Sequence, residues 1–313
     1  MSSGSPRAIL LMGPTGAGKT DLAIELAAAW PVEIVSVDSA LVYRGLDIGT
    51  GKPARDVLAR VPHHLVDILD PAQPYSAGQF IRDAVRLFGE IRARGRVPLL
   101  VGGTMLYFRA LTRGMAPLPP ADPQMRADLA AEAQELGWPA LHRQLAQVDA
   151  AAAARILPND AQRIQRALEV FHLTGQPLTE WQAVTRPALP DVQFQRIAWG
   201  PADREVLYAR IEQRFNAMLT AGFLEEVRHL YGRSDLHPEL PALRSVGYRQ
   251  LWTHLAGVTT LADAVREGIL ATRHLARRQL IWLRKEPDLE WIDSLDSASP
   301  ARIKACMARF FAD

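Results

Sequence analysis

Eight consecutive residues near the amino terminus have the composition of a phosphate-binding loop. They fit the pattern G-x-x-x-x-G-K-[ST] at every required position, and they are Gly13, Pro14, Thr15, Gly16, Ala17, Gly18, Lys19 and Thr20. Glycines let the backbone curl so that successive N–H groups face phosphate oxygens, and the lysine adds a mobile positive charge. The threonine hydroxyl suits Mg²⁺. The pattern therefore predicts a diphosphate or triphosphate site with Mg²⁺, in a kinase, an ATPase or a transferase with a diphosphate leaving group.

The segments on both sides of this loop are those that such a site needs. Residues 8–12 form an apolar run typical of a buried strand, and residues 21–30 are rich in alanine and leucine, as in a helix. A loop between strand and helix places a bound phosphate at the positive end of the helix dipole. The alternative is a glycine-rich turn without a ligand, but strand, loop and helix all favour the phosphate site.

Strand and helix patterns continue to alternate through the first third of the chain. Residues 33–37 and 97–101 are short apolar runs, and residues 79–94 repeat apolar side chains at helical spacing. This alternation predicts an α/β fold of the P-loop NTPase type, in which a mostly parallel sheet is flanked by helices.

A helical insertion is expected within this fold. Residues 115–123 contain four prolines, which break regular structure, and residues 127–184 have helical segments but no strand pattern. We therefore expect a P-loop α/β core formed by residues 1–119 and 192–313, with an inserted all-helical domain at residues 120–191.

Asp38 follows the strand expected at residues 33–37. In open α/β sheets the carboxyl ends of the strands face the ligand crevice. Asp38 could therefore act as a general base or a metal partner, or it could simply begin a turn or cap a helix. Its position alone leaves these alternatives open.

Composition limits the cellular setting. The net charge of +2 does not by itself indicate a nucleic-acid binder, so such a role depends on local basic patches. The single cysteine, Cys306, excludes an internal disulfide and suits a reducing compartment. The amino terminus lacks the apolar stretch of a signal peptide, and the apolar runs are too short to span a membrane. We expect a cytoplasmic protein, without membrane association, that acts as a monomer.

Beyond the phosphate loop, the sequence resembles the tRNA dimethylallyltransferases, from that loop to about Arg284. The matching segments follow the family's order: DSALVYRGLDIGTGKP at 38–53, PHHLVDILDP at 62–71, YSAGQF at 75–80, GGT at 102–104 with Tyr107, QRIQRALE at 162–169, AGF at 221–223, GY at 247–248, and Thr272 to Gln279. One departure is Leu41, where the family often has an amide.

The resemblance implies an activity and roles for particular residues. The family transfers a dimethylallyl group from dimethylallyl diphosphate to N6 of adenosine 37 in tRNA, beside the anticodon. Asp38 would be the base that accepts the N6 proton, with Thr104 and Arg126 near the reaction centre. The phosphate loop would bind the diphosphate, and Thr20 would ligate Mg²⁺. A small-molecule kinase, an enzyme that prenylates free adenine nucleotides and a non-enzymatic RNA-binding protein are the competing hypotheses.

Several segments are expected to contact tRNA. Arg266, Arg273, Arg277 and Arg284 are spaced so that they share one helix face, although a solvated charged face is the alternative without the resemblance. The full set of expected tRNA contacts is Asp38, Ser39, Ala40, Leu41, Thr104, Arg126, Gln162, Arg163, Ile164, Gln165, Arg166, Arg244, Ser245, Val246, Gly247, Tyr248, Arg249, Arg273 and Arg277.

Overall fold

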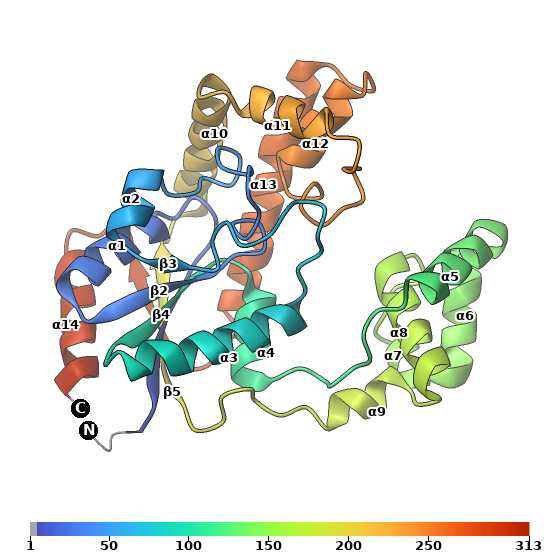
Figure 1. Ribbon diagram of the computed structural model, residues 1–313, viewed down its shortest axis with the longest axis horizontal. Coiled ribbons are helices and arrows are strands. Elements are labelled where there is room, and N and C mark those ends of the chain that lie inside the picture. Colours follow the sequence, from blue (N-terminus) through green and yellow to red (C-terminus); the bar gives the residue numbers. More distant parts are fainter. Residues whose placement is uncertain (1–4, 313) are drawn as a thin grey trace. The chain divides into compact units, whose positions relative to one another are not determined.

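A computed structural model describes residues 5–312, and its centre is a six-stranded sheet (Figure 1). Each pair of neighbouring strands is parallel, in the order β3-β2-β4-β1-β5-β6. The strands are β1 (Arg7–Met12), β2 (Val32–Val37), β3 (His63–His64), β4 (Val97–Gly102), β5 (Gln193–Gly200) and β6 (Leu289–Asp293). The α/β fold with a parallel sheet is confirmed, whereas β3 and β6 had no signal strong enough to predict.

Helices cover both faces of the sheet. On one face, α1 (Lys19–Ala29) and α14 (Ser299–Ala312) pack against β1, β2 and β4 through a buried apolar cluster that includes Leu22, Ile34 and Phe310. The helix α3 (Ala77–Ala93) contacts β2 and β4. It begins at a capping box, in which Ser76 and Gln79 each bond the backbone N–H of the other. These helices cover the faces of the sheet and leave the edge formed by the carboxyl ends of its strands open for a site.

Three loops leave that carboxyl edge side by side. The phosphate loop follows β1, Asp38 follows β2, and Gly103 with Thr104 follows β4. Strands β1 and β2 both pair with β4, so segments that are distant in sequence meet at one edge. This topology brings Asp38 to the same edge as the phosphate loop.

A group of helices stands beyond this edge. The helices α10 (Arg204–Thr220), α11 (Phe223–Tyr231), α12 (Tyr248–Leu255) and α13 (Leu261–Leu283) contact one another in sequence, and α10 also contacts α13. The short α2 (Arg55–Arg60) and the first part of α4 (Met105–Arg113) complete the helices outside the insertion. Among residues 5–312, no helix combines the length and apolar character needed to cross a membrane.

The chain forms two compact units, and the second consists of residues Ala110–Pro190. Its first boundary falls inside α4, whereas the proline cluster predicted residue 120. The two differ because prolines mark where regular structure ends, whereas a compact unit is defined by which residues pack together. The unit contains α5 (Pro123–Leu136), α6 (Trp138–Val148), α7 (Ala150–Ala153), α8 (Ala161–Thr174) and α9 (Leu178–Ala183). Its core is built from residues such as Leu141, Leu145 and Leu168.

Candidate active site

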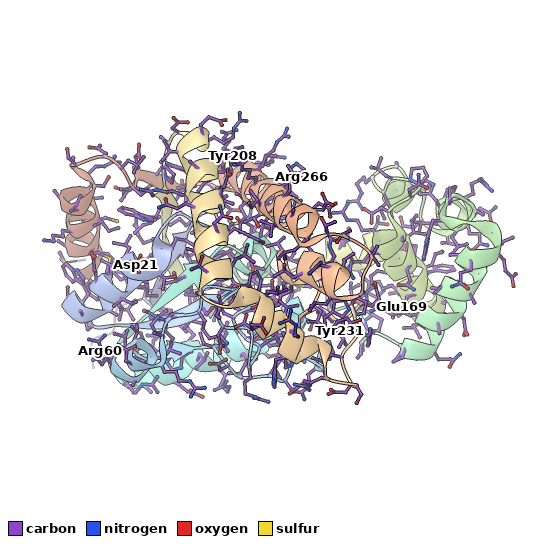
Figure 2. All side chains as sticks on the ribbon, turned by 90° about the horizontal axis from the view of Figure 1, so that it is seen from above. Asp21, Arg60, Glu169, Tyr208, Tyr231 and Arg266 are labelled. Carbon is purple, nitrogen blue, oxygen red and sulfur yellow. The ribbon has the colours of Figure 1, made fainter. Side chains whose placement is uncertain are left out.

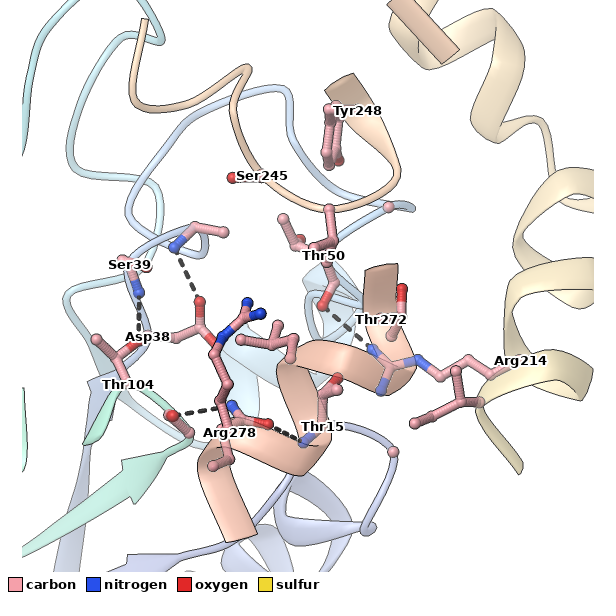
Figure 3. A pocket seen from close by; sticks show the side chains of 18 of the residues that line it. Thr15, Asp38, Ser39, Thr50, Thr104, Arg214, Ser245, Tyr248, Thr272 and Arg278 are labelled. Carbon is pink, nitrogen blue, oxygen red and sulfur yellow. Dashed lines mark hydrogen bonds between the residues drawn. The ribbon is translucent and has the colours of Figure 1, made fainter. Parts of the chain in front are cut away.

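Two cavities open at the carboxyl edge of the sheet. The first, of about 680 Å³, lies against Lys19 and Thr20 and is called here the phosphate-loop cavity. The second, of about 450 Å³, lies between the strand-end loops and α12 and α13 (Figure 3). Both volumes are in the range of small-molecule sites. The residues that line both are Thr15, Gly16, Asp38, Thr50, Gly103, Arg214 and Gln279.

The phosphate loop has the backbone that its glycines allow. Gly18, which precedes α1, has φ 81°, a left-handed conformation that favours glycine. A Cβ on Gly13 would lie 2.2 Å from the carbonyl oxygen of Trp199, so only glycine fits between the loop and β5. Lys19 donates a hydrogen bond to the Pro14 carbonyl over 2.7 Å. Burial lowers the pKa of the Lys19 ammonium to about 8, despite the opposing effect of the Asp38 carboxylate.

Gln279 of α13 joins the phosphate loop to the loop after β4. Its Oε1 accepts the Thr15 N–H at 2.9 Å, and its Nε2 donates to the Gly103 carbonyl at 2.8 Å. The side chain is almost entirely buried. Sequence reasoning placed Gln279 in a family segment but gave it no role, since nothing local shows which loops a helix will meet.

Asp38 and Thr104 hold the adjoining turn. Asp38 Oδ1 accepts the Ala40 N–H at 2.8 Å, and Thr104 Oγ1 accepts the Ser39 N–H at 3.1 Å (Figure 3). Asp38 therefore does form a turn, as one alternative held, but it also lines both cavities. Within residues 5–312, its second carboxylate oxygen has no hydrogen-bond partner and remains available for chemistry.

Arg214 is a site residue that sequence reasoning missed. It projects from α10 into both cavities and donates through Nη2 to the Thr50 carbonyl at 3.2 Å. Burial lowers the pKa of its guanidinium, while the nearby carboxylates of Asp38 and Asp21 act in the opposite direction. The sequence does hold a clue to this role. Arg214 lies beside Ile211 and Phe215 on the apolar face of a helix, and a charged side chain on such a face often has a functional partner.

The residues around Thr20 suit Mg²⁺. The Thr20 hydroxyl, the Asp38 carboxylate and the Ser36 hydroxyl all line the phosphate-loop cavity and offer the oxygen ligands that Mg²⁺ prefers. Ser36 Oγ is buried and has no hydrogen-bond partner among the described residues. Across residues 5–312, no cluster of three or more His, Cys, Asp or Glu side chains could hold a metal alone. Phosphate oxygens would have to supply further ligands.

The second cavity gathers many of the residues expected to contact tRNA. These are Asp38, Ser39, Ala40, Thr104, Arg244, Ser245, Val246 and Tyr248. Leu41 lines the phosphate-loop cavity instead, and Arg249 is exposed elsewhere on α12. Gly247 and Tyr248 are buried, so they shape the cavity wall more than they offer surface.

The arginines expected on one face of α13 are not the residues of α13 that line the second cavity. Arg273 bonds Glu212 at 2.5 Å and lies over the ring of Tyr208 on α10, and Arg266 bonds Asp263 at 2.7 Å. Figure 2 labels Tyr208 on α10 and Arg266 on α13. Arg277 is exposed outside the cavity. The α13 residues that line it are Thr272, Leu275, Arg278, Gln279 and Trp282. The arginine spacing was right for one face, but the packing of α13 on α10 and α12 turns a different face inward.

In the helical unit, the expected basic residues surround one buried carboxylate. Glu169, labelled in Figure 2, accepts from Arg126 at 2.9 Å and from Arg166 at 2.7 Å, and it also accepts the Asp122 N–H. Burial would raise the pKa of Glu169, but these bonds outweigh it and hold the pKa below its usual range. The Gln165 amide donates to the Arg126 carbonyl at 2.9 Å.

The remaining residues of this segment divide between surface and core. Gln162 and Arg163 are exposed, and Arg163 pairs with Asp160 at 2.8 Å. Ile164 is fully buried in the core of the helical unit, so its side chain offers no surface in this conformation, and its contact with tRNA stays a prediction. The helical period places it opposite the exposed residues.

Comparison with known proteins identifies a family. The family model described as IPP transferase matches residues 41–286, and the model described as isopentenyl transferase matches residues 6–66. The chain is 56% identical over 306 residues to a tRNA dimethylallyltransferase of Burkholderia ambifaria (strain MC40-6), covering 97% of this chain and 94% of that protein. A tRNA dimethylallyltransferase of Burkholderia orbicola (strain MC0-3) is also 56% identical, over 302 residues, 96% of this chain and 93% of that protein.

Solved structures show the same likeness. A tRNA isopentenylpyrophosphate transferase from Bacillus halodurans is 35% identical with a TM-score of 0.69, over 98% of this chain and 96% of that one. A eukaryotic dimethylallyltransferase acting on tRNA is 25% identical with a TM-score of 0.81, over 98% of this chain and 80% of that one.

Proposed function

This chain belongs to the IPP transferase family of tRNA dimethylallyltransferases, which confirms the resemblance of its motifs, and on that premise we propose the reaction that its site performs. The chain transfers the dimethylallyl group of dimethylallyl diphosphate to N6 of adenosine 37 in tRNA and releases diphosphate. We further propose that the chain acts as a monomer and, because its substrate is tRNA, that it acts in the cytoplasm.

The observation that carries this proposal is the meeting of the two cavities at Asp38. One cavity contains the phosphate loop, and the other contains polar and basic residues such as Arg244 and Arg278. A donor that enters on the phosphate side and a base that enters on the other side would face each other across Asp38, Thr50 and Arg214. A transferase needs two substrates in this arrangement.

Charge in the phosphate-loop cavity suits a diphosphate leaving group. As the allylic C–O bond breaks, negative charge develops on the diphosphate, and the Lys19 ammonium, the loop N–H groups and the Arg214 guanidinium stabilise it. Mg²⁺ held by Thr20 and the diphosphate oxygens would supply further charge neutralisation when bound. The hydroxyl of Ser36 and the carboxylate of Asp38 also line this cavity and would be further oxygen ligands for the ion.

Asp38 is the group placed to accept the proton. The N6 amine of adenine is a weak nucleophile because its lone pair is delocalised into the ring, so removing its proton as the new C–N bond forms assists the reaction. The Ala40 N–H holds one Asp38 oxygen and thereby fixes the carboxylate. Thr104 fixes the Ser39 backbone beside it and acts as a positioning residue.

Access of the base requires the tRNA to be remodelled. A base that is stacked within the anticodon loop cannot reach the interior of the second cavity, so adenosine 37 must turn out of its stack, and basic side chains must hold the backbone. Arg244 and Arg278 line the second cavity and are suited to that contact. Arg126, Gln162, Arg163, Gln165 and Arg166 of the helical unit are proposed as further tRNA contacts, as the family resemblance implies.

The proposal is tested with labelled dimethylallyl diphosphate, Mg²⁺ and an unmodified anticodon stem-loop carrying adenosine 37. Label should pass to the stem-loop and not to AMP in a parallel reaction. Transfer to AMP alone would instead favour a free-nucleotide prenyltransferase. Consumption of ATP without any transfer would favour a kinase or an ATPase.

The role of Asp38 is tested separately with Asp38→Asn. The amide oxygen can still accept the Ala40 N–H, so the turn and diphosphate binding should persist while kcat falls by roughly 10²–10⁴-fold. Asp38→Ala should abolish transfer with the fold retained. Full turnover by either variant rules out Asp38 as the base.

A further inference from the structure

One carboxylate on α11 holds a loop that lies against both cavities. Glu226 accepts three consecutive backbone N–H groups, those of Asp47 at 2.9 Å, Ile48 at 2.7 Å and Gly49 at 3.1 Å. It also accepts the Tyr248 hydroxyl at 2.5 Å. Hydrogen bonds to an ionised carboxylate are stronger than neutral ones, so a single side chain fixes this turn.

The same loop is fixed at its other end. The Lys52 ammonium is nearly inaccessible and bonds the Tyr43 carbonyl, the Asp47 carboxylate and the Asp67 carboxylate. Between the two ends, a Cβ on Gly49 would lie 2.1 Å from the ring of Phe223. Residues 47–52 are therefore held by charge at both ends and by close packing in the middle.

The held loop in turn meets the arginine of the site. The Thr50 carbonyl, directly after the three bonded N–H groups, accepts from Arg214 Nη2 at 3.2 Å. A Cβ on Gly51 would lie 1.9 Å from that same Nη2, so the guanidinium rests directly on the loop. Arg214 lies close enough to Lys19 and Asp38 for their charges to interact. A displacement of the loop would therefore displace the guanidinium.

We propose that Glu226 is a positioning residue that sets Arg214 for diphosphate through the Thr50 carbonyl. Glu226 itself lines neither cavity, whereas Thr50 and Arg214 line both. The inference rests on the proposed function for its place in the reaction, but its physical content is the affinity of the site for a diphosphate group.

The variant that tests this is Glu226→Gln. The amide nitrogen cannot accept a hydrogen bond, so at least one of the three N–H groups loses its acceptor with little change in shape. We expect inorganic diphosphate with Mg²⁺, measured by titration calorimetry, to bind about tenfold more weakly. In transfer assays, KM for dimethylallyl diphosphate should rise more than kcat falls.

Glu225→Gln is the matched control. Glu225 is the preceding residue on α11, its side chain is 69% exposed, and within the described part of the chain its ion pair is a local one with Arg228. This variant makes the same chemical change without touching the loop and should bind diphosphate as the unaltered protein does. An equal loss in both variants would overturn the proposal, because the effect would then be one of net charge.

A double-mutant cycle distinguishes positioning from general structural support. If Glu226 acts through Arg214, then Glu226→Gln should cause little further loss of diphosphate affinity once Arg214→Ala is present. Equal losses in both backgrounds would overturn the proposal. If Glu226→Gln unfolds, Glu226→Asp, which keeps the charge but is one methylene shorter, takes its place in the same cycle.

The readouts keep this inference separate from the proposed function. Diphosphate binding needs no transfer, so an unaltered protein that binds diphosphate but transfers nothing to the stem-loop contradicts the proposed function alone. Unchanged diphosphate affinity in the Glu226 variants, with transfer intact in the unaltered protein, contradicts the inference alone.

Discussion

Gln279 accepts the backbone N–H of Thr15, so a residue of α13 is bonded directly to the phosphate loop. The neighbouring Arg278 lines the second cavity from the same helix. One helix thus carries a side chain for each cavity. If a ligand in the second cavity moved α13, the side-chain amide of Gln279 would transmit that movement to the phosphate loop.

Replacing Gln279 should weaken donor binding. Gln279→Leu leaves the Thr15 N–H without its acceptor and removes one of two donors to the Gly103 carbonyl, which still accepts from the Met105 N–H. The loss costs about 1–3 kcal/mol, and part of that cost should appear as about a 5- to 50-fold rise in KM for dimethylallyl diphosphate. Gln279→Glu keeps an acceptor for Thr15 but adds negative charge beside the loop and should raise KM further. His274→Gln, at an exposed position of α13, is the control. An unchanged KM in Gln279→Leu would show that the bridge is dispensable.

The pKa of Lys19 predicts how donor use depends on pH. Since burial lowers this pKa from 10.5 to about 8, the side chain of the free protein is charged below pH 8 and loses its proton above it. We expect kcat/KM for dimethylallyl diphosphate to be level near pH 7 and to fall up to about tenfold per unit above pH 8. In Lys19→Met, kcat/KM for dimethylallyl diphosphate should be low and should not change over this pH range. A level profile in the unaltered protein up to pH 9.5 would contradict the assignment.

The lowered pKa of Lys19 also affects the stability of the fold, which changes with pH in the opposite direction to diphosphate affinity. Between about pH 8 and 10.5 the folded protein binds fewer protons at Lys19 than the unfolded chain does. Stability from this group therefore rises with pH over that window, as diphosphate affinity falls. The contribution of Lys19 to stability is therefore smallest in the pH range where its charge favours diphosphate most.

The local parts of the site could be predicted from the sequence. The phosphate loop is contiguous, and its strand and helix lie on either side, so eight residues define it. Asp38 follows from the rule that parallel strands end at one edge. Both predictions need only local patterns and the sheet class, and the structure places Asp38 and the loop in one cavity.

The parts supplied by long-range packing could not be predicted. Arg214, Glu226 and Gln279 stand on helices, whose periodicity shows which residues share a face but not which loop that face meets. The arginines of α13 show the limit, since Arg277 and Arg278 differ by one position and only Arg278 lines the cavity. Strand β6 was missed because its five residues, Leu289–Asp293, mix charged and apolar side chains without a clear alternation.

The carboxylate of Glu169 should be the main polar stabiliser of the helical unit. Its side chain is fully buried, and it bonds both Arg126 and Arg166, so Glu169→Gln should lower the free energy of unfolding of this unit by about 2–3 kcal/mol. Arg163→Ala breaks an exposed pair on the same helix and should cost about 0–1 kcal/mol. Hydrogen exchange of α8 amides measures both. Equal effects would mean that the buried bonds add nothing beyond surface pairing.

Two glycine substitutions should change stability in opposite directions. Gly49→Ala would place a Cβ 2.1 Å from the buried Phe223 ring and 2.6 Å from that of Tyr248, so the loop must move, at a cost of about 1–3 kcal/mol. Gly89 is exposed within α3 and has no atom within 4 Å of an added Cβ, so Gly89→Ala should stabilise by about 0.5–1 kcal/mol. Denaturant unfolding gives both values.

Because the loop also holds Arg214, Gly49→Ala should weaken diphosphate binding as well, whereas Gly89→Ala should leave it unchanged. A Gly49→Ala protein with normal stability and affinity would mean that the loop has room to shift without moving the guanidinium.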